Sequence, residues 1–123
     1  TIEKLVARGC LRTTRMGSRA YEQYLELVAA DSVDALGRGE SAALSYANEV
    51  RGIVVLDDRK AKRIGRARFP NCDQWTSIEL FRQARKAGAI SKREMAKIVQ
   101  LAISNARMHV LVEERKWLVE LGL

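Results

Sequence analysis

The chain has 123 residues, of which 47% are hydrophobic and 30% are charged, and this composition argues against a disordered or fibrous protein. Its size suits a single domain. The 22 Lys and Arg residues exceed the 15 Asp and Glu residues, giving a net charge of +7 that favours polyanionic partners. The longest aliphatic run, residues 53–56, is far shorter than the roughly 20 residues of a membrane span, so we expect a cytoplasmic protein without a membrane partner.

Helical spacing and short β-branched runs alternate along the first half of the chain. We expect Ser18 to cap the second helix and residues 37–39 to form a glycine turn. The expected elements, in chain order, are a helix over residues 2–8, an edge strand over 10–14, a helix over 18–30, a strand over 32–36, the glycine turn and a helix over 40–49.

Residues 53–56 form the clearest strand of the sequence. Their continuous aliphatic run predicts a strand that is buried on both faces of a parallel sheet. A basic helix over residues 59–66 follows, and residues 69–72 are expected to form a further short strand around Pro70. Helices on both sides of the central strand indicate the α/β fold class.

The second half of the chain is predicted to be helical. Thr76 and Glu79 are spaced as a capping box before a helix that Gly88 ends, and Ser91 and Glu94 repeat this spacing before the next helix. A last helix is expected over residues 112–121. Since there is no internal repeat or linker, residues 1–123 are expected to form one domain.

The two cysteines, Cys10 and Cys72, lie far apart and match no metal-binding spacing. We expect both to be reduced, buried thiols. Aromatic side chains at helical spacing, namely Trp75, Phe81 and Trp117, are interpreted as core residues in preference to base-stacking platforms.

Three acidic residues stand where chemistry is expected. Asp57 and Asp58 follow the central strand, and ligands of open α/β sheets bind beyond the carboxyl ends of the strands. Glu40 opens the preceding helix after a glycine turn and could project over the same sheet edge. Carboxylates that gather there would hold Mg²⁺ or Mn²⁺. The alternative is that these acids have structural roles. Glu40 would be stabilised by the dipole of its own helix, and Asp57 or Asp58 would cap the next helix.

Basic residues follow these acids directly. Arg59, Lys60 and Arg63 could bind phosphates next to an anionic reaction centre. The alternative is a solvated helix face without a ligand. The lone histidine, His109, is not required if a metal-bound water is the nucleophile.

Three segments resemble conserved motifs of the PIN-domain ribonucleases, and most closely a PIN-like group related to the toxins of toxin–antitoxin modules. GRGESAAL at residues 37–44 is similar to the GE motif of that group, and VVLDDRKA at residues 54–61 is similar to its LLDD motif. ARKAGAI at residues 84–90 resembles its AKxxGLI segment. Thr76-Ser77 stands where the family usually has a Gly-Thr pair, which is a departure from the pattern.

The resemblance implies a three-layer PIN-like, Rossmann-like fold, with a short parallel sheet flanked by helices and a helix-rich C-terminal half. It implies a Mg²⁺- or Mn²⁺-dependent endoribonuclease in which Glu40 and Asp58 bind the metal and Asp57 lies beside them. The partners to expect are RNA, an antitoxin protein and, for a homodimer, a second copy of the chain.

PIN domains begin with a strand that carries an essential Asp, whereas this sequence begins with a predicted helix. We therefore expect the chain to lack the first strand and helices of the domain, and activity to depend on that missing acid. An inactive PIN-like protein that binds nucleic acid or acts as a scaffold is the second hypothesis. A DNA-binding helix pair over residues 91–122 is the third, but the even scatter of charge there argues against it.

Overall fold

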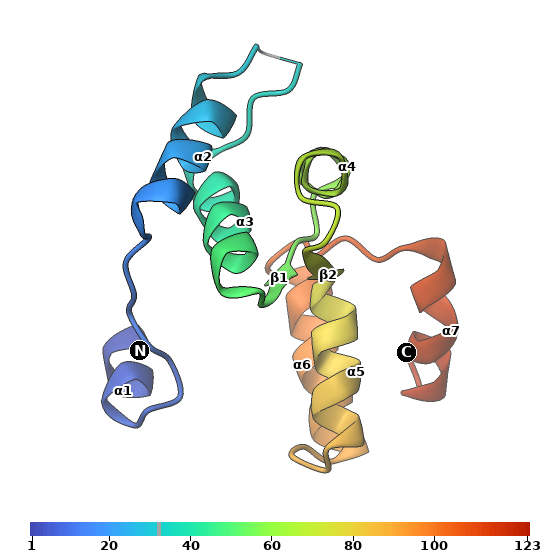
Figure 1. Cartoon of the computed structure of the whole chain (residues 1–123). Helices are drawn as coiled ribbons and strands as arrows, with labels where there is room; N and C mark the ends of the chain where they lie inside the picture. Colours follow the sequence, from blue (N-terminus) through green and yellow to red (C-terminus); the bar gives the residue numbers. More distant parts are fainter. Residues whose placement is uncertain (32) are drawn as a thin grey trace.

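The protein is described from a computed structural model, which defines residues 1–31 and 33–123. It is an α/β structure rich in helix, as the sequence predicts. The elements shown in Figure 1 are, in order, α1 (Ile2–Ala7), α2 (Ser18–Ala29), α3 (Arg38–Val50), β1 (Ile53–Val55), α4 (Arg59–Arg68), β2 (Asp73–Trp75), α5 (Ser77–Lys86), α6 (Lys92–Ser104), a 3₁₀ turn η1 (Val112–Glu114) and α7 (Arg115–Glu120). Within residues 1–31 and 33–123, no helix has the length and apolar character needed to cross a membrane.

The two strands form a parallel β1–α4–β2 unit. Ile53 pairs with Asp73 and Val55 with Trp75, and the Leu56 amide donates to the Trp75 carbonyl at 2.9 Å. Parallel pairing places the carboxyl ends of both strands at the same edge of the sheet. The residues that follow β1 and β2, Asp57 and Thr76, therefore lie at one end of the unit.

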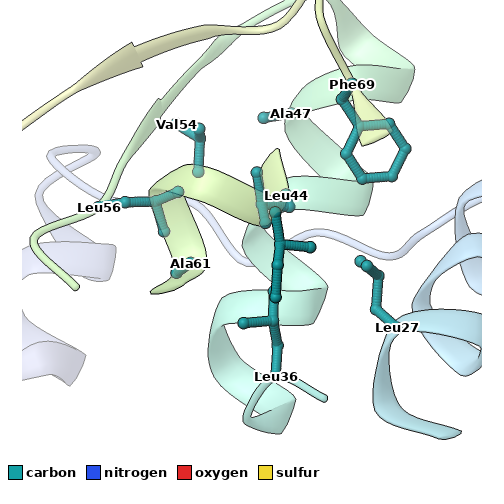
Figure 2. Close-up of a cluster of buried hydrophobic side chains, with 9 residues drawn as sticks. Leu27, Leu36, Leu44, Ala47, Val54, Leu56, Ala61 and Phe69 are labelled. Atoms are coloured by element: carbon teal, nitrogen blue, oxygen red, sulfur yellow. The ribbon is translucent and has the colours of Figure 1, made fainter. Parts of the chain in front are cut away.

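The main hydrophobic cluster fixes α3 and α4 against β1. Leu44 of α3, Val54 of β1 and Ala61 of α4 gather in it, as Figure 2 shows. Its buried members are Leu27, Leu36, Leu44, Ala47, Val54, Leu56, Ala61, Ile64 and Phe69. Since α2 contributes Leu27 and lies beside α3 (Figure 1), one cluster joins the first four elements after α1.

The expectation that the central strand is buried on both faces is wrong. Val54 is only 3% exposed, whereas Ile53 and Val55 on the other face are 46% and 38% exposed. A continuous aliphatic run indicates that both faces of a strand can be buried, but the elements around this short sheet cover only one face. The burial therefore alternates as in a half-covered strand.

A second cluster joins α5, α6 and the C-terminal segment. Ile78, Met95, Val99 and Leu121 form its buried centre. Phe81 and Trp117, which were expected to be core residues, are partly buried and pack against this centre. Thr76 and Ser91 are the predicted N-caps: the Glu79 amide donates to Thr76 Oγ1 at 3.1 Å and the Glu94 amide to Ser91 Oγ at 3.2 Å. The Glu79 carboxylate accepts from Arg82 and Gln83 of its own helix.

Two predicted strands are wrong. In place of an edge strand at residues 10–14, the Cys10 and Leu11 amides both donate to the Leu5 carbonyl and close α1. In place of a strand at residues 69–72, the Phe69 amide donates to Gly65 and the Cys72 amide to Phe69, so this segment is the turn that ends α4. The strand begins afterwards, at Asp73.

The predicted strand at residues 32–36 is also not formed by its described part. The Asp34 and Ala35 amides both donate to the Asp31 carbonyl, at 2.8 and 2.7 Å, and make a turn. Residue 32 lies outside the described residues.

Three predicted helix ends are shifted. Gly37 is the N-cap of α3, so Arg38 and Gly39 belong to the helix and the expected glycine turn is wrong. Gly17, and not Ser18, is the N-cap of α2, and its amide donates to the Glu49 carboxylate at 3.0 Å. The predicted last helix is divided into η1 and α7.

The two cysteines are free, but they differ in exposure. Cys10 is exposed, which corrects the expectation of a buried thiol, and Cys72 is half-buried. Burial raises the pKa of the Cys72 thiol, and the neighbouring Asp73 carboxylate raises it further. The thiolate of Cys72 is therefore less populated than that of an ordinary cysteine at the same pH.

Gly65 lies on the buried side of α4, where a side chain has no space. A Cβ there would lie 2.8 Å from Leu44 Cδ2 and 2.5 Å from Gln74 Nε2. We expect Gly65→Ala to lower the free energy of unfolding by about 1–3 kcal/mol, as overpacking does. Gly39→Ala is the matched control, because its Cβ would meet no atom within 4 Å and should stabilise α3 by about 0.5–1 kcal/mol. Denaturant unfolding measures both; equal effects would contradict this packing.

Alkylation should distinguish the two thiols. Because the thiolate is the reactive form, we expect iodoacetamide to label Cys10 first, and labelling of Cys72 to need a more alkaline pH than an exposed cysteine does. Mass spectrometry of peptides against time gives both rates. Faster labelling of Cys72 at every pH would refute this assignment.

Candidate functional site

Asp57 links the end of β1 to the start of α5. Its Oδ1 accepts a hydrogen bond from the Ser77 amide at 2.8 Å, and its Oδ2 accepts one from Ser77 Oγ at 2.6 Å. The side chain is half-buried. Both carboxylate oxygens are thus oriented by a single residue of α5, although each keeps a further lone pair for another donor or a cation.

Asp58 is the N-cap of α4. Its Oδ2 accepts from the Ala61 amide at 2.9 Å, so the structural alternative considered from the sequence is confirmed for this residue. The residue is also exposed. Capping uses one lone pair of one oxygen, so the carboxylate of this exposed residue keeps further acceptor positions.

Glu40 lies in the first turn of α3 and is half-buried. An acid there is favoured by the helix dipole, as the structural alternative supposes. Leu36, just before α3, packs in the same cluster as Leu56 and Ala61, so the starts of α3 and α4 share one core. Among residues 1–31 and 33–123, no three His, Cys, Asp or Glu side chains form a group that could hold a metal ion. A role for Glu40 at the metal stays a prediction.

An open depression of about 540 Å³ lies at this sheet edge. Asp57, Asp58, Arg59 and His109 line it. The structure therefore brings together two of the three predicted acids, one of the predicted basic residues, and a histidine that sequence reasoning set aside. His109 is far from Asp58 along the chain. The only signal for it in the sequence is that it is the single histidine.

The segment that carries His109 is anchored on both sides. Before it, the Met108 amide donates to the Ala102 carbonyl at the end of α6 at 2.9 Å. After it, buried Glu114 accepts from the Leu111 amide at 3.0 Å and from Thr76 Oγ1 at 2.5 Å. Since Thr76 is the N-cap of α5, the same helix start positions both His109 and Asp57.

The donors at the depression suit a Mg²⁺ ion. Asp57 and Asp58 offer carboxylate oxygens, and Mg²⁺ is usually held by one or two carboxylates together with water and substrate phosphate, without a closed protein cage. Asp57 and Asp58 supply the number of protein carboxylates that such a site uses. The hydrogen bonds from Ser77 and Ala61 limit the directions from which an ion could approach.

The predicted phosphate-binding residues differ in their surroundings. Arg59 lines the depression and is exposed, while Lys60 is half-buried. Arg63 forms an ion pair with Asp34 at 3.5 Å in which both side chains are about 60% exposed. An exposed pair of this kind contributes little to stability, so Arg63 can exchange its partner for a phosphate.

Comparison with protein-family models, with curated proteins and with solved structures found no match for the chain.

Proposed function

We propose that this chain is a PIN-like, Mg²⁺- or Mn²⁺-dependent endoribonuclease whose reaction centre is the depression lined by Asp57, Asp58, Arg59 and His109. The observation that carries the proposal is the position of two acids at the carboxyl end of β1 in a parallel β–α–β unit. Ligand sites of open α/β sheets lie there. A three-layer fold, a toxin-like role and an antitoxin partner are proposed on the motif resemblance alone.

RNA is bound through its phosphates. Arg59 offers a guanidinium at the depression, and Arg63 lies one turn further along the same helix. A guanidinium can donate two parallel hydrogen bonds to a phosphate. The net charge of +7 adds a general attraction for the RNA backbone.

Asp57 and Asp58 would hold the divalent ion. When bound, such an ion polarises the phosphodiester and lowers the pKa of its bound water. The protein's part is orientation: Ser77 fixes both oxygens of Asp57, and the capping bond fixes Asp58 at the start of α4. These bonds reduce the reorganisation that binding would otherwise need.

His109 donates a proton to the oxygen that leaves phosphorus. A broken phosphodiester bond releases an alkoxide, which is a poor leaving group unless a general acid protonates it. His109 lines the same depression as the acids and Arg59, and no other histidine exists in the chain. The shared depression supports a role for His109 as the general acid beside the two carboxylates and the phosphate-binding Arg59.

A second candidate function is RNA binding without cleavage. It is favoured by a specific observation: the carboxylates of Asp57 and Asp58 both already accept structural hydrogen bonds, as they would in a protein that performs no reaction. In this case Arg59 and Arg63 bind RNA, and the acids only fix β1, α4 and α5.

Neutral variants of the acids test the nuclease proposal. We expect Asp58→Asn to lower metal-dependent cleavage of single-stranded RNA by on the order of 100-fold, as expected for the loss of one group that stabilises the transition state. Asn is as good an N-cap as Asp, so α4 and the thermal stability should be retained. Glu40→Gln tests the third predicted acid in the same assay.

Wild-type protein with excess EDTA is the control for a contaminating nuclease. Equal cleavage by the wild type, Asp58→Asn and Glu40→Gln would exclude the metal-dependent reaction. RNA binding that persists without any cleavage, and that Arg59→Gln weakens, would support the second candidate.

The leaving group tests His109. We expect His109→Asn to lower RNA cleavage by about 100-fold, but to leave cleavage of a p-nitrophenyl phosphodiester almost unchanged, because p-nitrophenolate departs without a proton. Steady-state rates with both substrates measure the ratio. A residue that only maintained the structure would affect both substrates equally, and that result would remove His109 from the reaction.

A further inference from the structure

A second cavity, of about 640 Å³, lies at the amino ends of β1 and β2. It is formed by the start of α2, the end of α3 and the turn before β2. Its charged and amide side chains are Arg19, Arg51, Gln23, Asn48, Asn71 and Glu49. Since the strands are parallel, this cavity and the Asp57–Asp58 depression lie at opposite ends of the sheet, separated by at least about 10 Å for three strand residues.

Specific contacts hold the walls of this cavity together. The Gly17 amide donates to Glu49 Oε2 at 3.0 Å and ties the start of α2 to the end of α3. A Cβ on Gly17 would meet the Glu49 carboxylate, so the Glu49 side chain would have to move to accept a larger residue there. The Cys72 thiol lies 3.9 Å from the Gly52 carbonyl, which brings the turn before β2 next to the end of α3. The cavity is therefore a built feature of the fold.

Arg51 occupies a backbone position that normally favours glycine. It caps α3 in the left-handed region, with φ 54° and ψ 40°, while the glycine of this segment comes one residue later, at Gly52. A non-glycine residue pays a conformational cost there, and such positions concentrate at functional sites. The cost is explained if the guanidinium of Arg51 is needed in the cavity.

The donors around the cavity match the parts of a nucleotide. Arg19 and Arg51 can donate paired hydrogen bonds to a phosphate. Gln23, Asn48 and Asn71 each offer both a donor and an acceptor, which is the pattern that reads the edge of a nucleobase. The Glu49 carboxylate, oriented by Gly17, can accept from ribose hydroxyls. Apart from Ala20 and Cys72, every lining residue is polar or charged.

We propose that this cavity binds a ribonucleotide phosphate, with Arg19 and Arg51 on the phosphate and the three amides on the base. The ligand is a free nucleoside monophosphate or the phosphorylated end of an RNA strand, which share this chemistry. The site does not depend on nuclease activity in the depression. Failure of one proposal would therefore leave the other standing.

Calorimetry with the four ribonucleoside 5′-monophosphates, adenosine and orthophosphate tests the site on the full chain. We expect at least one monophosphate to bind more tightly than adenosine and orthophosphate. Arg51→Gly is the sharpest variant, because glycine suits the left-handed backbone: affinity should fall by about tenfold or more, while the melting temperature is retained or rises. Arg19→Gln should weaken binding similarly.

Arg115→Gln is the matched control and should bind nucleotide like the wild type, because Arg115 is exposed at the start of α7 and lines neither the cavity nor the depression. The side-chain amide NMR signals of Gln23, Asn48 and Asn71 should shift when the ligand is added. If no monophosphate binds, if orthophosphate binds as tightly as every nucleotide, or if Arg51→Gly and Arg19→Gln bind like the wild type, the proposal is overturned.

Two short RNA strands of one sequence, with a 5′-phosphate or a 5′-hydroxyl group, identify the source of the ligand. They are added to the Asp58→Asn variant so that cleavage does not interfere. Tighter binding of the phosphorylated strand than of the free monophosphate supports a strand end as the ligand, and the reverse order supports the free nucleotide.

Discussion

The hydrogen bonds between the Asp57 carboxylate and Ser77 connect the two hydrophobic clusters of this protein. Leu56, directly before Asp57, is buried in the cluster of α2, α3, β1 and α4, and Ile78, directly after Ser77, is fully buried in the cluster of α5 and α6. The Leu56–Trp75 backbone bond supports the same junction. Loss of Ser77 as a donor would leave the half-buried Asp57 carboxylate without these hydrogen bonds and weaken the junction.

The same junction places the candidate reaction centre. The start of α5 holds Asp57 through Ser77 and holds buried Glu114 through Thr76, so one helix start orients an acid of the depression and the segment that carries His109. Structural and chemical roles need not compete here, because a carboxylate that is fixed by hydrogen bonds still offers lone pairs to a cation. The opposite end of the sheet has a different character: arginines and amides line a concave cavity there, with a single carboxylate.

Local signals in the sequence were reliable where a local interaction decides the structure. Thr76 and Ser91 were predicted as caps, and both accept the expected backbone bond three residues later. Predictions failed where distant residues decide. The segment around Pro70 has the composition of a strand, but it forms the turn that ends α4. Ser18 is a residue type that often caps helices, but the cap of α2 is Gly17, whose amide donates to Glu49 of another helix.

The sequence alone determined the α/β class, the position of the central strand and the presence of Asp57 and Asp58 at its end, because hydrophobic periodicity and capping act over a few residues. Only the tertiary structure decided that one face of β1 stays open, that His109 joins the acids, and that Arg19 and Arg51 share a cavity. These facts depend on which segments pack together across long stretches of chain. Hydrophobic periodicity shows which face of an element is buried, but not which distant element covers that face.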